Sequence, residues 1–182
     1  ARSEEWKGRQ RARQVRCGAG KATQVGSISP SGGGKRQVWA TEVGRTTASR
    51  HGIAAGGAGA VGVGFPAAIG GQLGWPDEKV WGVGGDGGFQ MTQMELATAA
   101  IHSLPAKCLI INNNYLGMVR QWQELFFENR LSGVDLVGNP DFVKLAQAYG
   151  IKAWRIRRPS DVDRIPVSYK HPPLPTNPCL RI

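Results

Sequence analysis

Three short apolar runs in the middle of the chain predict buried β-strands. The first, Lys79–Val83, holds two valines and a tryptophan and ends in glycines. The second run is Cys108–Ile111, and the third is Ile151–Ile156. Short apolar runs bounded by turn-forming residues are typical of strands inside a sheet.

A segment with helical spacing of apolar residues separates the first two runs. Thr92 and Glu95 match a capping box, in which the hydroxyl and the carboxylate satisfy free backbone N–H groups at a helix start. The predicted helix continues to about His102. Its apolar positions are Met94, Ala97, Ile101 and Leu104.

Two more helices are predicted between the second and third runs. Residues from Met118 to about Phe127 have helical character, and a later helix has Asn139 as its N-cap, Pro140 at its first position and Gly150 as its stop. The apolar face of this later helix is Phe142, Leu145, Ala146 and Tyr149. Alternating strands and helices predict an α/β fold, a parallel sheet with flanking helices, which binds ligands at the carboxyl ends of its strands.

Charge divides the 182 residues into three parts. Residues 1–50 hold 11 Lys and Arg against 3 Asp and Glu, residues 51–150 hold 5 against 8, and residues 151–182 hold 7 against 2. We expect a poorly structured basic arm over 1–50, a folded domain over 51–158 and a proline-rich irregular tail over 159–182. Because prolines interrupt helices and central strands, we expect neither in the tail, so that the sheet is incomplete at its ends.

The cysteines and the apolar stretches indicate in which cellular compartment the protein is expected. The three cysteines are far apart, which argues against a zinc knuckle or a disulfide framework and favours a reducing compartment. The uncharged stretch Gly52–Trp75 is too rich in glycine for a membrane span. Because Glu4 and Glu5 stand where a targeting peptide avoids acidic residues, we expect no such peptide and a cytoplasmic protein without a membrane partner.

Polar residues follow two of the predicted strands. The loop Gly84–Gly88 carries the single carboxylate of Asp86, which we expect to point outward, and Asn113 comes 27 residues later, after the next strand. Neighbouring parallel strands bring such loops together. A carboxylate, an amide oxygen and a backbone carbonyl suit Mg²⁺, which completes its ligand shell with phosphate oxygens and water. The sequence therefore predicts a magnesium and diphosphate site.

These loops and their surroundings resemble a known family. Gly85–Gly87 with Asn112 and Asn113 is similar to the thiamine-diphosphate motif, and the match runs from about Gly56 to Arg158. The stretches that carry it are GGAGAVGVGFPAAIGGQL, GGDGGFQMTQMELATAA, LPAKCLIINNNYLGMVRQWQELFFENR and NPDFVKLAQAYGIKAWRI. They resemble the C-terminal domain of the acetolactate synthase catalytic subunit, and LGMVRQW favours this enzyme over related decarboxylases and carboligases.

The resemblance implies roles for individual residues. Asp86 and Asn113 would hold Mg²⁺ through their side chains, and Tyr115 through its backbone carbonyl. The other implied cofactor contacts are Gly59, Val61, Gly85, Gly87, Gly88, Gly117 and Met118, with Val61 in the place of a bulkier residue that bends the cofactor. Val119 and Trp122 would line the channel for substrate or inhibitor. The resemblance implies no catalytic residue in this chain, because the glutamate that activates the cofactor belongs to another domain.

Departures from the family limit what we expect of the chain. After Val43 and Gly44 the family continues with a segment that contacts the diphosphate, whereas Arg45 follows here. Two preceding family domains, one of which binds FAD, do not match anything in this sequence. We therefore expect a partial chain, inactive alone, and hypothesise that its unusual ends reflect a truncated gene or a shifted reading frame.

By resemblance, the parent enzyme condenses two pyruvates, or pyruvate with 2-oxobutyrate, with loss of CO2, in branched-chain amino-acid biosynthesis. It would be a homo-oligomer, with a regulatory subunit as a further partner and a plastid location if the source is a plant. Two alternatives stay open: another thiamine-diphosphate-dependent 2-oxoacid decarboxylase or carboligase, and a non-catalytic basic fragment that binds polyanions. The charge sits in the terminal segments, and nucleic acid is the less favoured partner.

Overall fold

Parallel strands form a single six-stranded sheet in the part of the chain that the structure covers. The structure is a computed structural model and describes residues 29–31, 51–158, 161 and 179–181. The strands are β1 (Ser29–Ser31), β2 (Gly52–Ala54), β3 (Trp81–Gly85), β4 (Lys107–Ile111), β5 (Ala153–Arg155) and β6 (Cys179–Arg181). Their order is β2-β1-β3-β4-β6-β5, and all of these pairings are parallel. The predicted α/β fold is confirmed.

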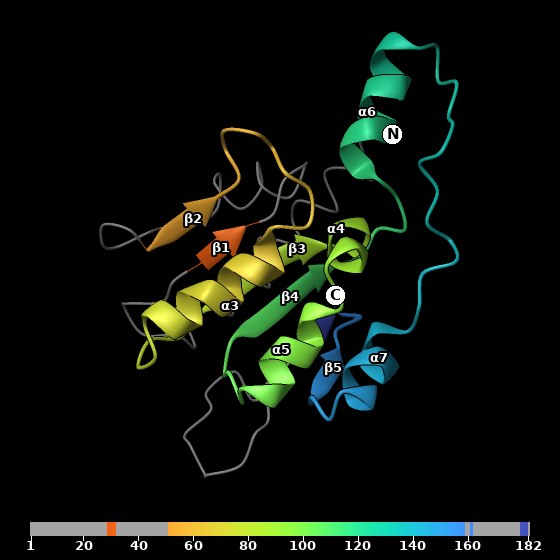
Figure 1. The fold of residues 1–182 in the computed structure, drawn as a ribbon. Coiled ribbons are helices and arrows are strands. Elements are labelled where there is room, and N and C mark those ends of the chain that lie inside the picture. Colours follow the sequence, from red (N-terminus) through yellow and green to blue (C-terminus); the bar gives the residue numbers. More distant parts are fainter. Residues whose placement is uncertain (1–28, 32–50, 159–160, 162–178, 182) are drawn as a thin grey trace.

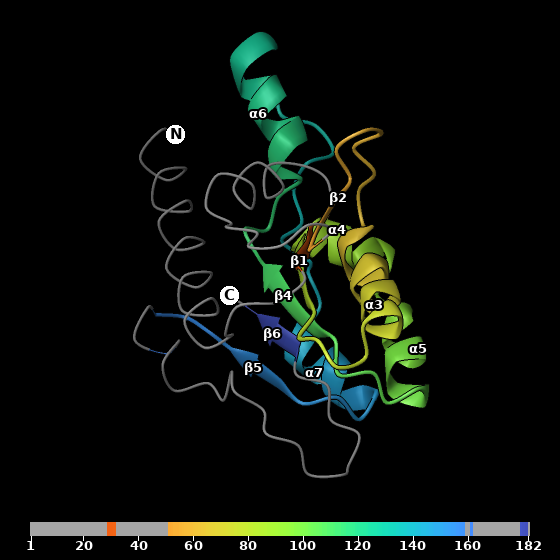
Figure 2. The same ribbon diagram turned by 90° about the vertical axis from the view of Figure 1, so that its left-hand side faces the viewer.

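A layer of helices covers one face of this sheet. The described helices are α3 (Gly64–Gly74), α4 (Asp86–Met91), α5 (Glu95–Ile101), α6 (Gly117–Phe126) and α7 (Phe142–Ala148). Helices α3, α5 and α7 lie against the sheet, whereas α6 extends beyond its end (Figures 1 and 2). Among the described residues, no helix has both the length and the apolar character that a membrane crossing requires.

One apolar cluster joins the helical layer to the sheet. Cys108 and Ile110, alternate residues of β4, belong to it and are buried. At its centre the ring of Phe89 lies 5.6 Å from the ring of Phe65 in α3 and 5.5 Å from that of Phe142 in α7, measured between centroids. Tilted and edge-on ring pairs of this kind add stability beyond their buried area. Phe89 belongs to α4, so the core fixes the helix that begins at Asp86.

A close approach between α3 and β3 depends on Gly82. A Cβ atom at this position would lie 2.9 Å from Cβ of Ala68 and 3.0 Å from the carbonyl oxygen of Gly64. Both neighbours belong to α3, and neither is the end of a flexible side chain. The missing side chain at Gly82 therefore lets α3 pack directly on the backbone of β3.

Two strands come from the segments predicted to lack them. β1 lies between β2 and β3, and β6 lies between β4 and β5, so the expectation of no strand in the tail is wrong at Cys179–Arg181. Three-residue strands carry no periodicity that a sequence pattern can detect, and their neighbours supply most of their hydrogen bonds. Apart from Asp161, the remainder of the predicted arm and tail lies outside the described residues, and the division into three parts stays a prediction.

The predicted capping box of α5 is wrong. The hydroxyl of Thr92 donates to the carbonyl oxygen of Gly62 at 2.9 Å, across to another segment. The carboxylate of Glu95 accepts a hydrogen bond from the hydroxyl of Thr98 at 2.9 Å, within the helix. Met94 occupies the N-cap position without a side-chain cap. The hydroxyl of Thr92 therefore forms a hydrogen bond to a distant segment and does not cap α5.

α5 also packs through a different face from the predicted one. Met94 and Ile101 are 58% and 77% exposed, whereas Leu96 and Ala99 are buried. Met94 and Ile101 are spaced so that they share one face of a helix, and so are Leu96 and Ala99, so spacing alone does not show which pair is buried. The buried pair belongs to the apolar cluster that joins the helices to the sheet.

The cap of α7 is Asp141 and not the predicted Asn139. The carboxylate of Asp141 accepts hydrogen bonds from the backbone N–H groups of Val143 at 3.0 Å and Lys144 at 3.4 Å. It also forms an ion pair with Arg155 of β5, with 2.6 Å between Nη2 and Oδ2. The hydrogen bond from Arg155, followed by those from the backbone, lowers the pKa of Asp141 to about 2. This residue ties the start of α7 to β5 and leaves Asn139 for another role.

Candidate functional site

The carboxyl ends of β3 and β4 lie side by side. Their register pairs Gly85 with Ile111, the last residues of the two strands. Asp86 follows one strand directly, and Asn112 follows the other. The two segments that the sequence predicted to meet therefore follow neighbouring strand ends at one edge of the sheet (Figure 1).

Asp86 is buried where the sequence predicted an exposed loop. β3 continues to Gly85, α4 begins at Asp86, and this residue is 0% exposed. The expected loop with an outward-pointing carboxylate is therefore wrong. The backbones of Gly84 and Gly85 pair with β4, so the glycines extend the strand. A carboxylate in the first turn of a helix is favoured by the free N–H groups there.

Asn139 connects Asp86 to the asparagine run after β4. Its side-chain nitrogen Nδ2 lies 2.9 Å from Oδ2 of Asp86, 3.0 Å from Oδ1 of Asn112 and 3.1 Å from Oδ1 of Asn114. Its oxygen Oδ1 accepts a hydrogen bond from Nε2 of Gln90 in α4. Asn112 belongs to the motif in the sequence but has no predicted role of its own. Asn114, Asn139 and Gln90 were not among the predicted site residues, because contacts across 25 to 53 positions leave no local sequence signal.

Local turns shape the asparagine run. The side-chain oxygen of Asn112 accepts from the backbone N–H of Asn114 at 3.1 Å, and that of Asn113 accepts from the N–H of Tyr115 at 3.3 Å. Asn114 has a φ of 58°, a left-handed conformation that asparagine tolerates better than most residues. The run therefore turns sharply at the edge of the sheet and gathers several amide oxygens there.

Tyr115 is held by its backbone and by a cation above its ring. It forms an antiparallel bridge with Asp135, whose two hydrogen bonds use the carbonyl oxygens of Asn114 and Val134. The bridge therefore does not consume the carbonyl of Tyr115, the atom predicted to bind the metal. The guanidinium of Arg120 lies 4.0 Å from the ring centroid of Tyr115. A hydrogen bond to Glu124, foremost among several contacts, raises the pKa of Arg120.

The glycine segment before α3 meets the start of α4. A Cβ atom at Gly88 would lie 3.4 Å from the backbone nitrogen of Gly62 and 3.7 Å from Cγ1 of Val61. Gly59 has a φ of +63°, which makes the preceding turn unfavourable for other residues. Two predicted cofactor residues, Val61 and Gly88, thus lie next to each other, and the side chain of Val61 is half exposed.

Gly87 packs against the loop that follows β4. A Cβ atom there would lie 2.6 Å from Cδ2 of Leu116 and 3.0 Å from Cδ1 of Leu136. The start of α4 therefore lies directly under the segment that leads into α6. This packing joins the two halves of the site, one from each strand end.

α6 places the predicted channel residues in solvent. It begins at Gly117, and none of its residues is buried. Val119 is half exposed, and Trp122 is 58% exposed with its ring 5.5 Å from that of Phe126. The helix projects from the carboxyl edge of the sheet (Figure 2). Gly117 and Met118 stand at its start, close in sequence to Tyr115.

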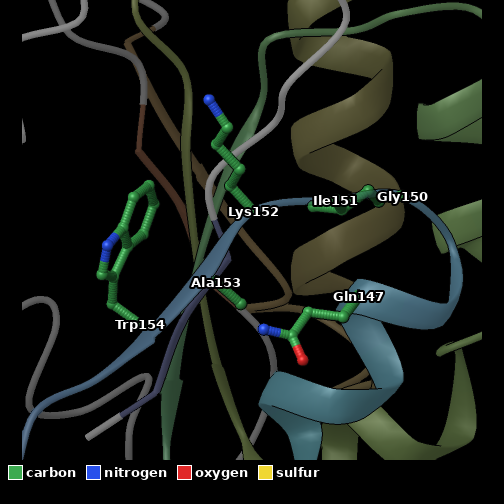
Figure 3. A pocket seen from close by; sticks show the side chains of 6 residues that line it. All are labelled: Gln147, Gly150, Ile151, Lys152, Ala153 and Trp154. Atoms are coloured by element: carbon green, nitrogen blue, oxygen red, sulfur yellow. The ribbon is translucent and has the colours of Figure 1, made fainter.

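A cavity of about 380 Å³ lies elsewhere, between α7 and β5. Its lining residues are Gln147, Gly150, Ile151, Lys152, Ala153 and Trp154. Figure 3 shows Gln147 on the side of α7 and Trp154 on the other side of β5. These residues lead into the amino end of β5, whereas Asp86 follows the carboxyl end of β3. The cavity is therefore separate from the Asp86 site.

The donor atoms around Asp86 fit an oxygen-preferring cation. Within the described residues, no three or more His, Cys, Asp or Glu side chains gather in a way that could hold a metal ion. The site offers one carboxylate with amide and backbone oxygens. Such a set suits Mg²⁺, which keeps few protein ligands, and does not suit Zn²⁺, which prefers nitrogen and sulfur.

Comparison with protein families shows which family the chain belongs to. Residues 32–167 match the model of the thiamine pyrophosphate enzyme C-terminal TPP binding domain. The chain belongs to the thiamine pyrophosphate enzymes. Thiamine pyrophosphate is another name for the thiamine diphosphate of the sequence resemblance, so the predicted family is confirmed, and the matched residues include both strand ends of the site.

Individual relatives of this thiamine pyrophosphate enzyme domain are acetolactate synthases. The chain is 44% identical over 140 residues to the "Acetolactate synthase" of Mycobacterium bovis. This match covers 75% of this chain and 23% of the relative. It is 45% identical over 130 residues to the "Probable acetolactate synthase large subunit" of Methanococcus aeolicus, covering 71% and 22%. It is 42% identical over 130 residues to the "Acetolactate synthase isozyme 2 large subunit" of Escherichia coli. This match covers 71% of this chain and 24% of the relative. The chain thus spans less than a quarter of these relatives' length.

Proposed function

We propose that this chain is the cofactor-binding part of an acetolactate synthase. The full enzyme would condense two pyruvates, or pyruvate with 2-oxobutyrate, with loss of CO2. The observation that carries the proposal is the buried Asp86 at the start of α4, beside the asparagine run after β4. Identities of 42–46% to acetolactate synthases support the choice of reaction within the family.

Specific residues would hold the cofactor and its metal. Asp86 and Asn113 would bind Mg²⁺ through their side chains, and Tyr115 through its backbone carbonyl. The cofactor contacts would be Gly59, Val61, Gly85, Gly87, Gly88, Gly117 and Met118. When bound, thiamine diphosphate supplies the electron sink for decarboxylation of a 2-oxoacid. FAD would belong to other parts of the full enzyme.

The chain's own residues would bind and orient the diphosphate. Free N–H groups at the start of α4, where Gly87 and Gly88 lie, favour an anion. The cation at Asp86 would offset the remaining negative charge. Val61, next to Gly88, would support the cofactor from the side of α3.

The substrate would enter past α6. The side chains of Val119 and Trp122 are apolar and exposed to solvent there. Exposed apolar side chains suit the entrance of a substrate channel. A second copy of the full subunit would complete the site, because no residue of α6 is buried within this chain. A regulatory subunit would be a further partner.

The first prediction tests the metal ligand. Asp86→Ala should abolish the Mg²⁺-dependent binding of thiamine diphosphate, because the negative charge of the diphosphate then lacks a bridging cation. A thermal-shift titration of the full chain with Mg²⁺ and thiamine diphosphate measures this. Wild type should gain about 3 kcal/mol of stability at a hundredfold excess over Kd.

The matched control is Asp77→Ala, which removes an exposed carboxylate before β3. It should bind the cofactor as wild type does. Equal cofactor affinity in wild type and Asp86→Ala would reject the assignment of Asp86. Far-ultraviolet circular dichroism shows whether each variant keeps its fold.

A further inference from the structure

Three side-chain oxygens converge on the amide nitrogen of Asn139. They belong to Asp86, Asn112 and Asn114 and lie 2.9, 3.0 and 3.1 Å from Nδ2. An amide NH₂ group has two hydrogens, so it cannot give each of three acceptors a full hydrogen bond. Oxygens gathered around one electropositive atom, one of them from a carboxylate, are the surroundings expected of an oxygen-ligated cation.

We propose that Asn139 is a positioning residue that competes with the cation for Asp86. Its amide nitrogen holds the carboxylate and the amide oxygens together, and a divalent cation displaces it. The inference rests on the proposed function, because it requires that Mg²⁺ binds at Asp86. It assigns to Asn139 a role that the sequence resemblance does not give.

The amide and a cation compete for the same oxygen of Asp86. Mg²⁺ binds oxygen at about 2.0–2.1 Å and needs the lone pairs of its ligands. The N–H groups of Asn139 use a lone pair of Oδ2 in Asp86, at a distance of 2.9 Å. Their partial positive charge also repels a cation at that place. A cation that bonds to this oxygen along the direction of that N–H therefore displaces the side chain of Asn139.

Gln90 fixes the orientation of the competing amide. Its Nε2 donates to Oδ1 of Asn139, which directs Nδ2 toward Asp86. The carbonyl of Leu136 accepts from the backbone N–H of Asn139 at 3.0 Å, and Asp141 is anchored two residues later. The backbone is thus held on both sides of Asn139. Its side chain can leave the oxygens without unfolding α7.

The second prediction follows from this competition. In the full chain at saturating thiamine diphosphate, Asn139→Ala should lower the Kd for Mg²⁺ about tenfold, because the cation no longer displaces a charge-assisted hydrogen bond. Isothermal titration with MgCl₂ measures the constant directly. Gln90→Ala, which loosens the amide without removing it, should lower the Kd by a smaller factor.

Thermal unfolding separates competition from a purely structural role. Without a cation, Asn139→Ala should have a lower Tm than wild type, because the oxygens lose the hydrogen bonds from Nδ2. At saturating Mg²⁺ and thiamine diphosphate the two Tm values should converge, since Asn139 no longer contacts Asp86 in either protein. A residue that only supports the fold would leave the same difference under both conditions.

The outcomes distinguish the two proposals. If wild type shows no Mg²⁺-dependent binding of thiamine diphosphate, the proposed function fails, and the competition fails with it. If wild type binds but the soluble variants have an unchanged or higher Kd for Mg²⁺, only the competition is rejected. A persistent Tm difference at saturating cation also rejects it. Should Asn139→Ala fail to fold, the Kd of Gln90→Ala decides alone.

Discussion

Lys107 places an ionisable group inside the sheet. It is the first residue of β4 and is only 5% exposed, with its ammonium 5.5 Å from the ring centroid of Trp81. Burial, and to a lesser extent the charge of Lys79, lowers its pKa to about 8. The folded protein therefore releases this proton at a lower pH than the unfolded chain does.

The third prediction concerns pH. Between pH 8 and about 10.4 the unfolded chain holds the proton of Lys107 more tightly, so this residue makes the free energy of unfolding rise with pH. Lys107→Met should remove that rise, by about 2–3 kcal/mol over the full range. Denaturant unfolding at pH 7, 8, 9 and 10 measures it. Lys144→Met, at an exposed position on α7, should keep the rise, and equal slopes in wild type and Lys107→Met would contradict the argument.

The sequence pattern predicted Asp86 as a site residue but did not predict which residues surround it. A lone acid between glycines after a strand is visible in the sequence, and so is the asparagine run one strand later. The burial of Asp86 is not visible, because its contact with Asn139, 53 positions away, forms only in the folded chain. Asn139 was assigned a capping role by its place before Pro140, yet Asp141 fulfils that role. Local rules cannot decide between two neighbouring polar residues that both suit a helix start.

At the scale of elements, the backbone contact between α3 and β3 sets the position of the site. α3 holds four glycines, which disfavour a helix, and this helix was not predicted. It forms because small residues let it pack directly on β3 at Gly82. The helices with clear apolar periodicity, α5, α6 and α7, were predicted at nearly their observed bounds. The short strands β1, β2 and β6 were not, because pairing with neighbours determines them.

The fourth prediction tests this contact with two glycines of one strand. Gly82→Ala should lower the free energy of unfolding by about 1–3 kcal/mol, because the added methyl group meets the backbone of α3. Gly84→Ala, two residues along β3, meets nothing within 4 Å and should change stability by less than about 0.5 kcal/mol. Denaturant unfolding compares the two. Equal losses would show that α3 can shift to accommodate a side chain.

At the scale of the whole molecule, the site is built from one side only. Its described residues gather at the carboxyl edge of β3 and β4, while α6 leaves Trp122 exposed. Exclusion of water from such a site needs further surface, and the chain spans 22–24% of its relatives' length. The remaining surface would come from other parts of the full enzyme.

The fifth prediction is that this chain alone forms no acetolactate from pyruvate, even with Mg²⁺ and thiamine diphosphate bound. By resemblance, the glutamate that activates the cofactor lies in another domain, and losing such a proton relay costs about 10² to 10⁴ in rate. A product assay, with and without the preceding domains of a relative, measures the activity. Turnover by the chain alone would show that a residue within it replaces the glutamate.

The position of β6 has a consequence for the order in which the sheet assembles during synthesis. β5 pairs with β6, and β6 also pairs with β4, although β6 follows both in the sequence. While the ribosome has not yet released residues 179–181, β4 presents an unpaired edge and β5 has no neighbour in the sheet. Exposed strand edges recruit other chains, and pairings between distant residues form slowly. The nascent chain therefore passes through an aggregation-prone interval that ends only when β6 takes its place between β4 and β5.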